Sequence, residues 1–526
     1  MSSSRSSPRF PSSSGRPPEV SDIAGVPAEH DAAGPSPAQL RHGAIGFLGN
    51  LVMGLAASAP GYGLASTIGL IAAIGGMGTH MPAVIIVSFL PMLFIALAYR
   101  HLNSVDPDCG TTFSWLTRAM GAGWGWLGGW IVIFSGIVVN ASQAQIAGSY
   151  TFELFGLHVA AKSTLAVTVL GVVFIALLTY ICWRGIEISA RTQQLLVGLE
   201  LATLILFAVV ALIRVYTTHP SDSITVDADW FNPAAIGFQQ LLVGMLLGVF
   251  LYWGWDSGVS VNEETKNPRS APGTAAVVAN FVLIGIFLLV SVAAQAYAGP
   301  NKLAKHADDI FAGSLNSDVL GPLHFLLTVA VLTSAAAATQ TTILPCARTA
   351  LSMARRGALP ARYANINDKN QVPGYATVVA GVLSAIWYIA IVNISTHVLA
   401  DVVVGVGFLV SLYYGFTGIA CAIFFRRELR KSFANMLTMG VLPILGALIL
   451  FVIFARGMVF YADSNNVSSQ LIWGLGIPDW IVLLLVVVGV VLMLIARVKL
   501  ADFFRRERRL VAGEPFATTS VEAGCT

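Results

Sequence analysis

The sequence predicts an all-α membrane protein with about 12 transmembrane helices. Of its 526 residues, 56% are hydrophobic and only 11% are charged, and the mean hydropathy is +0.75. A soluble chain carries about 25% charged residues, and a water-soluble fold of this size could not bury so much apolar surface. Two further observations support this fold class. They are the spacing of the long apolar runs and the placement of lysine and arginine between them.

A helix needs about 20 apolar residues to cross the hydrocarbon core of a bilayer. Twelve segments meet this criterion. They cover approximately residues 43–77, 81–99, 123–150, 163–183, 189–214, 236–265, 273–298, 321–347, 373–393, 398–425, 434–456 and 478–497.

An even number of spans places both ends of the chain on the same side of the membrane. Of the 30 lysine and arginine residues, all but five fall on that side. The five exceptions are Lys162, Arg214, Lys302, Lys305 and Arg456. Because cytoplasmic loops carry most basic residues, we expect a multi-pass protein of the plasma membrane with both termini cytoplasmic.

The two ends of the chain differ in composition from the spans. Residues 1–40 are rich in serine and proline, which predicts a disordered cytoplasmic tail. No apolar core followed by a cleavage site lies near Met1, so we expect no signal peptide. Residues 498–526 predict a cytoplasmic C-terminal tail.

Two spans carry a break near their middle. The first contains the stretch Ala57–Gly63, with a proline and two glycines, and the sixth contains Phe250–Gly258, with an acid inside it. Proline removes a backbone donor and glycine permits non-helical angles. Breaks at corresponding positions of two halves mark the binding site of many transporters. We therefore expect a ten-helix inverted-repeat core over residues 41–425, with halves 41–214 and 236–425, followed by two additional helices within 426–497.

Broken helices offer a ligand backbone groups that intact helices do not. Amides at the start of a half-helix favour a carboxylate, and exposed carbonyls favour an ammonium group. Such backbone survives at membrane depth only inside the protein or along a wet cavity. The alternative is a pair of kinks that only pack. The predicted substrate-binding residues are Ser58, Ala59, Pro60, Gly61, Phe250, Trp253, Gly254 and Asp256.

Three ordered motifs resemble those of the amino acid–polyamine–organocation superfamily. They are Pro107–Trp115 with the following Gly121–Trp130, then Glu263–Arg269, then Arg348–Pro360. The resemblance covers roughly residues 41–500. It implies the five-plus-five inverted-repeat fold also used by sodium-dependent leucine transporters, with the substrate held between the two breaks.

The resemblance also implies roles for single residues. Asp256 falls where some antiporters of the superfamily carry a glutamate linked to pH sensing, and Phe250 falls where they place an aromatic lid over the substrate. Glu200 falls where proton-coupled relatives place a lysine that takes the role of a sodium ion. The sequence from Ser58 to Gly61 departs from the Gly-Ser-Gly type that the superfamily uses in its first break.

Two carboxylates lie at membrane depth, where an acid is costly unless it is protonated or paired. Glu200 sits near the middle of the fifth span, and we expect it and Asp256 to serve proton coupling or gating. The alternatives are a neutral acid bonded between helices for Glu200 and a helix cap for Asp256.

Other polar groups have weaker assignments. Glu263, Glu264 and Lys266 are either an inner gate with Arg348 or ordinary interfacial charges, and Asp401 is expected at the outer interface. The eighth span carries four hydroxyl residues that in sodium-coupled relatives complete a cation site, although bonds to their own helix are commoner. These four are Thr333, Ser334, Thr341 and Thr342.

Together these features predict a secondary active transporter for an amino acid or related amine, working by proton-coupled symport. Exchange of substrates is the alternative within transport, and a membrane-embedded amino acid sensor is the alternative outside it. No phosphate-binding loop, nucleophile–base arrangement or metal-ligand spacing is present, so we expect no enzyme activity, no cofactor and no metal. We expect membrane lipid and no nucleic acid as partners. The sequence does not indicate an oligomeric state.

Overall fold

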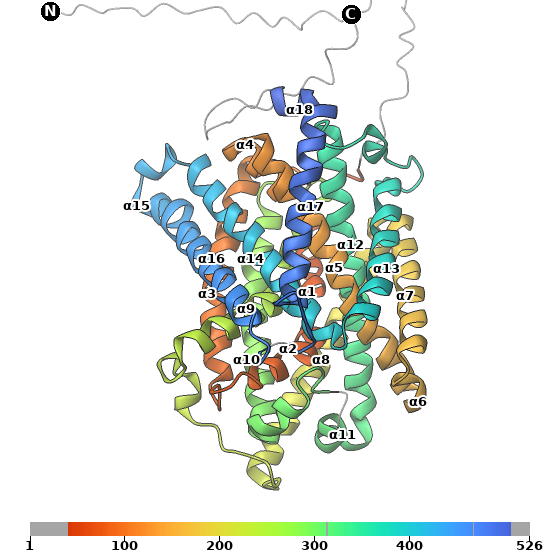
Figure 1. Ribbon diagram of the computed structural model, residues 1–526, viewed down its shortest axis with the longest axis vertical. Coiled ribbons are helices and arrows are strands. Elements are labelled where there is room, and N and C mark those ends of the chain that lie inside the picture. The colour runs from red at the N-terminus through yellow and green to blue at the C-terminus, as the bar shows by residue number, and fades with distance from the viewer. Residues whose placement is uncertain (1–39, 312–313, 467, 507–526) are drawn as a thin grey trace, which may run out of the picture. The chain divides into compact units, whose positions relative to one another are not determined.

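The computed structural model describes residues 40–311, 314–466 and 468–506. The disordered tail predicted for residues 1–40 lies outside these ranges except for Leu40, and of the expected C-terminal tail the structure describes residues 498–506. Within the described ranges the chain is almost entirely helical (Figure 1).

The first half of the chain contains five spans, of which the first consists of α1 and α2, and two short connecting helices, α4 and α6. They are α1 (Phe47–Ser58), α2 (Pro60–Ala72), α3 (Met81–Val105), α4 (Thr112–Met120), α5 (Ala122–Leu154), α6 (His158–Ala161), α7 (Thr164–Arg184) and α8 (Ile186–Thr217).

The helices of the second part follow a loop with two short 3-10 turns. They are α9 (Phe238–Tyr252), η3 (Trp255–Gly258), η4 (Asn262–Glu264), α10 (Ala271–Lys305), α11 (Ser314–Leu320), α12 (His324–Arg355), α13 (Gly374–Ile394), α14 (Val398–Phe424), α15 (Phe433–Asn435), α16 (Leu442–Tyr461), α17 (Ile477–Lys499) and α18 (Ala501–Arg506). Two short antiparallel strands, β1 (Leu471–Ile472) and β2 (Leu475–Gly476), lie between α16 and α17.

Twelve segments of the described chain are long and apolar enough to cross a membrane, which confirms the predicted all-α membrane fold. The largest difference from the expected spans is the eighth, which runs over Leu315–Arg355 instead of 321–347. It starts earlier because α11 precedes α12, and it ends later because α12 continues to Arg355. Inside a bilayer only helices or closed barrels satisfy every backbone group, so the long apolar runs become helices. The inverted-repeat relation between the halves stays a prediction.

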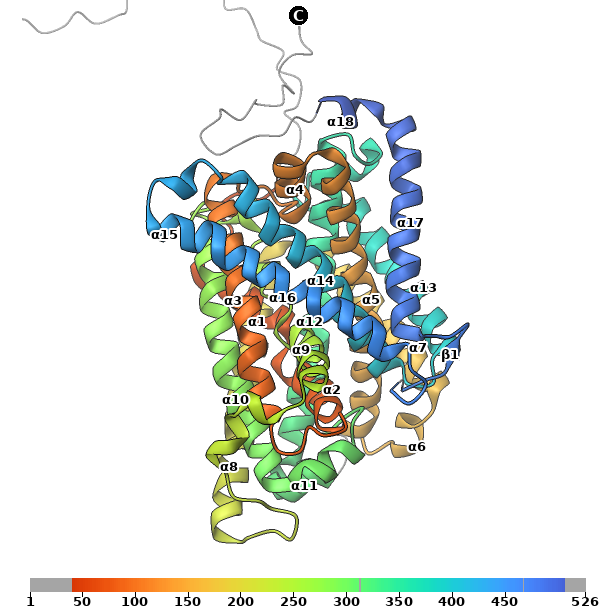
Figure 2. The same ribbon diagram turned by 60° about the vertical axis from the view of Figure 1, so that its left-hand side comes forward.

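The bundle has a basic end and an opposite end. At the basic end α7 ends at Arg184, α12 at Arg355 and α17 at Lys499, whereas α2, α10 and α16 end at the opposite end (Figures 1 and 2). In α17 an acid, Asp479, lies in the first turn and the basic residues lie in the last turn, which matches the helix dipole.

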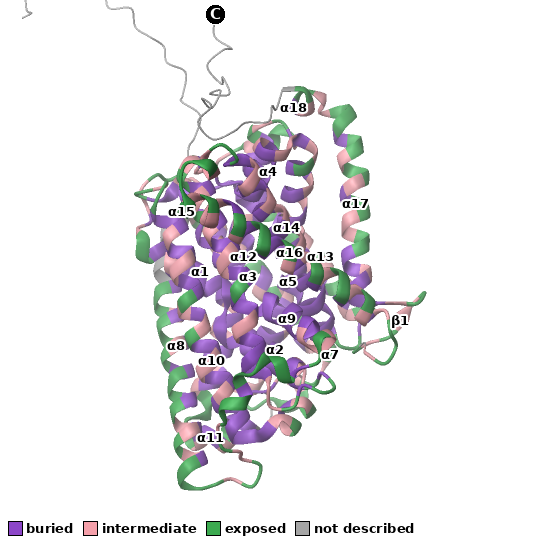
Figure 3. Ribbon diagram, turned by 90° about the vertical axis from the view of Figure 1, so that its left-hand side faces the viewer, coloured by how far each residue is buried: buried purple, intermediate pink, exposed green. Residues whose placement is uncertain are grey.

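The broken spans lie at the centre of the bundle. In the most apolar stretch of the first span 94% of residues are buried, and in the tenth span, α14, 89% are buried. The corresponding share is only 22% in α17, whose outer surface is exposed over much of its length (Figure 3). The first span, the sixth span and α14 therefore form the core that the other helices surround.

The two breaks touch each other through backbone. Gly254 has φ of +117°, and a Cβ placed there would lie 2.5 Å from the carbonyl carbon of Ala57 and 2.5 Å from the nitrogen of Ser58. A Cβ on Gly258 would lie 2.4 Å from the carbonyl oxygen of Asn50. Only glycine permits this approach, so these two positions hold the sixth span against the first.

Replacing Gly254 by alanine is expected to destabilise the protein by about 2–5 kcal/mol, because the new methyl group meets fixed backbone at an unfavourable φ. Thermal unfolding of the purified protein in detergent measures the effect. Gly285→Ala is the control, since a Cβ there meets nothing within 4 Å on an exposed face of α10. Equal melting temperatures for Gly254→Ala and the native protein would contradict the proposed contact.

Candidate functional site

The first break is one residue long. Ala59 has φ of 46° and ψ of 67°, a left-handed conformation that separates α1 from α2. Pro60 follows at the first position of α2, where the missing N–H of proline costs nothing. A left-handed alanine is unfavourable by about 1–2 kcal/mol, so neighbouring contacts must hold it. Ser58, the last residue of α1, donates its hydroxyl to the carbonyl oxygen of Gly54 at 3.1 Å.

Glu200 on α8 provides the main contact to this break. Its Oε1 accepts a hydrogen bond from the N–H of Gly61 at 2.6 Å and another from the Ser334 hydroxyl of α12 at 2.7 Å. The Ser334 oxygen in turn accepts the N–H of Tyr62 at 3.1 Å. The side chain of Glu200 is only 1% exposed, and its Oε2 is buried without a hydrogen-bond partner. Glu200 therefore caps the positive end of α2 and keeps one free oxygen.

The amides expected to receive a substrate carboxylate are thus already bonded. A carboxylate could reach the N–H groups of Gly61 and Tyr62 only by replacing Glu200 and Ser334. The position of Glu200 within the fifth span predicts that it lies at membrane depth. The sequence does not show that its side chain contacts the first break.

The sixth span does not resume as an α-helix after its break. α9 ends at Tyr252, Trp253 is extended, Gly254 is left-handed, and the chain continues in the 3-10 turns η3 and η4. The expected break between Phe250 and Gly258 therefore begins at Trp253.

Asp256 in η3 points to α14. Its Oδ2 accepts a hydrogen bond from the Tyr413 hydroxyl at 2.9 Å, and the same hydroxyl accepts the indole N–H of Trp253. Tyr413 thus joins both sides of the sixth break. Tyr413 could not be identified as a site residue from the sequence, because nothing near a tyrosine in an apolar helix indicates which residues it contacts.

Phe250 lies across the first break from Tyr62. Their ring centroids are 6.2 Å apart at an interplanar angle of 72°, an edge-to-face contact, and Phe250 is buried. The Tyr62 hydroxyl is 2.6 Å from the Ser142 hydroxyl of α5. The structure thus brings Phe250 beside the first break, and its role as a lid stays a prediction.

The hydroxyl residues of α12 have protein partners. Thr333 and Thr341 donate to carbonyl oxygens of their own helix at 2.8 Å. Thr342 donates to the Oδ1 of Asn140 at 2.7 Å, and Ser334 donates to Glu200. This arrangement matches the structural alternative for these hydroxyl groups more closely than a cation site.

The basic end is closed by an ion pair. Arg348 donates from Nε to Oε2 of Glu264 at 2.7 Å and from Nη2 to Oε1 at 2.9 Å, and both side chains are almost completely buried. Beside this pair the backbone of Ile45, just before α1, bonds to Glu264 and Lys266. The predicted contact between Glu264 and Arg348 is therefore present, whereas Lys266 contributes through its backbone.

A second cluster of polar side chains, centred on Asp108, lies near this pair. Asp108 accepts hydrogen bonds from Ser352 at 2.6 Å and Ser114 at 2.7 Å, and it pairs with Arg356 at 2.8 Å. Burial alone would raise the pKa of Asp108, but the Arg356 guanidinium and these hydroxyls hold it below its usual value. Burial and the neighbouring charge of Asp108 raise the pKa of Asp106 to about 6.

Ligand atoms of Asp108, Cys109 and Glu263 lie within 4.8 Å of one another. However, Asp108 pairs with Arg356 and Glu263 pairs with Arg355 at 2.8 Å. Two guanidinium groups beside these acids oppose the binding of a cation, so the group fits a structural network better than a metal site.

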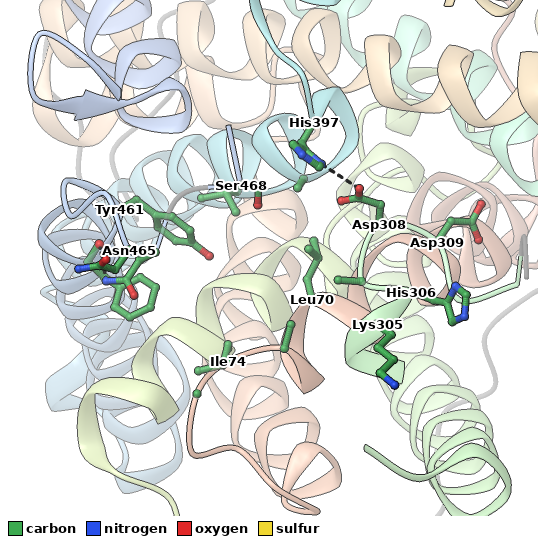
Figure 4. Close-up of a pocket in the computed structure, with 17 residues that line it drawn as sticks. Leu70, Ile74, Lys305, His306, Asp308, Asp309, His397, Tyr461, Asn465 and Ser468 are labelled. Atoms are coloured by element: carbon green, nitrogen blue, oxygen red, sulfur yellow. Dashed lines mark hydrogen bonds and ion pairs between the residues drawn. The ribbon is translucent and has the colours of Figure 1, made fainter. Parts of the chain in front are cut away.

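The opposite end contains a cavity of about 860 Å³. It lies between the end of α2, the loop after α10, the start of α14 and the end of α16 (Figure 4). His397 and Asp308 form a 3.0 Å pair along its wall. Asp401, expected at the outer interface, lies in the first turn of α14, where its side chain is buried within the protein and accepts hydrogen bonds from Ser395 and Ser469. The described part of the protein thus has a buried ion pair at its basic end and a cavity at the other end.

Comparison with known proteins adds a family match. A family model described as "Amino acid permease" matches residues 45–495. The chain is 24% identical to a branched-chain amino acid permease of Lactococcus lactis, over 57% of this chain and 64% of the relative. It is 24% identical to a vacuolar cationic amino acid transporter of Arabidopsis thaliana, over 58% and 52%, and 25% identical to a methylthioribose transporter of Bacillus subtilis, over 62% and 70%. The chain therefore covers less than two thirds of the first two relatives.

Removing the Glu264 carboxylate is expected to open the basic end. Glu264→Gln leaves Arg348 buried and unpaired, which costs about 3–5 kcal/mol, and should expose the buried thiol of Cys109, whose Sγ lies 3.5 Å from the carbonyl oxygen of Arg348. Maleimide labelling of Cys109 in a Cys525→Ser background, read by mass spectrometry, measures the opening.

Arg355→Gln is the matched control, because it breaks the half-exposed pair with Glu263 and should cost about 1 kcal/mol or less. Equal labelling of Cys109 in the native protein and in Glu264→Gln would contradict the closing role of the buried pair.

Proposed function

Because the chain belongs to the amino acid permease family, we propose that it is a secondary active transporter that carries an amino acid or related amine across the plasma membrane. Transport proceeds by alternating access and is coupled to protons. The observation that carries this proposal is the buried carboxyl group of Glu200, bonded to the first amide of α2 with one oxygen free.

Alternating access requires two gates that open in turn. The buried pair of Glu264 and Arg348 closes the basic end, and the cavity of about 860 Å³ opens at the opposite end. With the basic end in the cytoplasm, as the distribution of lysine and arginine favours, the cavity faces outward. The two backbone breaks then lie between the gates, which supports their assignment as the substrate site.

Proton binding would act on α2 through Glu200. The ionised carboxylate is a strong acceptor at the positive end of α2, and a proton on Oε2 would weaken the bond from the Gly61 N–H. α2 also forms part of the cavity wall through Leu70, and Ile74 lines the cavity just after the helix ends. A protonation change at Glu200 would therefore bias the position of the helix that borders the outer opening.

The charges of the site favour a substrate with an amine. Among the described residues neither Glu200 nor Asp256 pairs with a lysine or arginine. A substrate ammonium group would supply the missing positive charge near Asp256. A neutral zwitterion and a cationic amino acid both satisfy this requirement, in line with the names of two relatives. An anionic amino acid would add a second carboxylate beside two buried acids, which is unfavourable.

Exchange of external for internal substrate is the second candidate. It uses the same gates and breaks but needs no proton at Glu200, whose bonds would then be purely structural. A non-transporting amino acid sensor is disfavoured by the cavity and the opposing buried gate, which a fixed binding site does not require.

Uptake into proteoliposomes tests coupling. With an imposed inward proton gradient, native protein should accumulate one amino acid or amine from a radiolabelled panel, and Glu200→Gln should bind it within about threefold of native affinity but fail to accumulate it. Glu153→Gln, an acid near the opposite end of α5, is the control and should accumulate normally. Uptake that ignores the gradient but requires internal amino acid would identify an exchanger and return Glu200 to a structural role.

Binding measurements test the sixth break. Tyr413→Phe removes the hydroxyl that joins Asp256 to Trp253, and it should weaken substrate affinity about 5–30-fold by leaving both groups without this partner. Tyr388→Phe is the control, because it removes a tyrosine hydroxyl whose partner is Gln145 of α5 rather than Asp256 or Trp253. Equal affinities for the two variants in a scintillation proximity assay would place the substrate elsewhere.

A further inference from the structure

A narrow apolar crevice of about 140 Å³ lies between α5, α12 and α13, in the half of the bundle nearest the basic end. Aromatic side chains of α5 form one wall, and small residues such as Ala350 of α12 and Ala380 of α13 form the other. Phe134 and Leu383 are half-buried, so the crevice reaches the surface of the bundle. Because α5, α12 and α13 are all long and apolar enough to cross a membrane, we expect this surface to face the hydrocarbon of the bilayer.

The aromatic wall is fixed in place. Trp130 donates its indole N–H to the carbonyl oxygen of Leu485 at 2.9 Å, and Trp126 donates to the carbonyl oxygen of Ala358 at 3.2 Å. The two indoles stack with centroids 5.7 Å apart. Because both N–H groups are bonded, neither ring can turn to fill the crevice without losing a hydrogen bond.

The positively charged side chain of Arg362 lies at the basic end of the crevice. The guanidinium of Arg362 lies 5.2 Å from the ring centre of Tyr375 and 5.7 Å from that of Tyr363, and Tyr363 lines the crevice. Arg362 is exposed, and no carboxylate of the described residues pairs with it. An arginine on aromatic rings at the membrane interface presents a planar donor fork suited to a phosphate.

We propose that this crevice binds one anionic phospholipid from the leaflet at the basic end. A segment of one acyl chain lies against Trp130 and Ala350, and the phosphate accepts hydrogen bonds from Arg362. The apolar lining matches an acyl chain, and the guanidinium of Arg362, which pairs with no carboxylate of the described residues, matches one phosphate.

The site would act on transport through α12. This helix carries Ala350 at the crevice, Arg348 at the closed end and Ser334 at the first break. A lipid wedged between α12 and α13 therefore contacts the helix that reaches both the gate and Glu200. The binding itself does not depend on the proposed function.

Quenching of tryptophan fluorescence by brominated lipids tests the site. In nanodiscs with a small mole fraction of brominated phosphatidylglycerol, quenching should exceed that given by brominated phosphatidylcholine, and the excess should fall in Trp130→Phe. Arg362→Gln should weaken the apparent affinity for the anionic lipid about tenfold, and Lys369→Gln, a cation of the same loop, should leave it unchanged.

Three results would overturn the proposal. The first is equal quenching by the two brominated lipids, and the second is unchanged quenching in Arg362→Gln. The third is loss of the additional quenching by phosphatidylglycerol when inorganic phosphate is added, which would show that Arg362 binds free phosphate. The melting temperature of Arg362→Gln in detergent shows whether the variant is folded. Native mass spectrometry gives a second readout, in which the native protein should retain one phosphatidylglycerol and Arg362→Gln none.

Discussion

The hydrogen bonds accepted by Glu200 hold the first break in a form that the membrane tolerates. Pro60 has no N–H, so the N–H groups of Gly61 and Tyr62 are the first that α2 presents, and buried amides without partners are costly. Glu200 and Ser334 satisfy both. The left-handed Ala59 and the close approach of Gly254 depend on that arrangement, because the two breaks share one backbone contact. The protonation of Glu200 inside the bundle is thus coupled to the backbone geometry of the two breaks.

Under the proposed alternating access, α12 connects the parts of the molecule that would move in turn. Near the middle of α12, Ser334 contacts Glu200, and near the basic end of the same helix Arg348 pairs with Glu264. A shift of α12 would therefore disturb the cap of α2 and the closed gate together. This shared helix gives a physical reason why the two openings of a transporter would exclude each other.

The sequence predicts the parts of the fold that local patterns determine. Hydropathy located the twelve spans, and glycine and proline located both breaks, which the structure places at Ala59 and at Trp253–Gly254. The partners of the site could not be predicted in the same way. Glu200 and Gly61 are 139 residues apart, and Tyr413 and Asp256 are 157 apart, so only the packing of helices brings them together. The same reason explains why the hydrogen bond from Ser469 to Asp401, 68 residues apart, could not be predicted.

Proton coupling through Glu200 requires this carboxyl group to change its protonation when substrate binds, and infrared difference spectroscopy detects such a change. Substrate added to the protein in lipid should produce a carboxyl band in the difference spectrum that shifts in heavy water and is missing in Glu200→Gln. A spectrum without a carboxyl band, or with the same band in Glu200→Gln, would contradict the account.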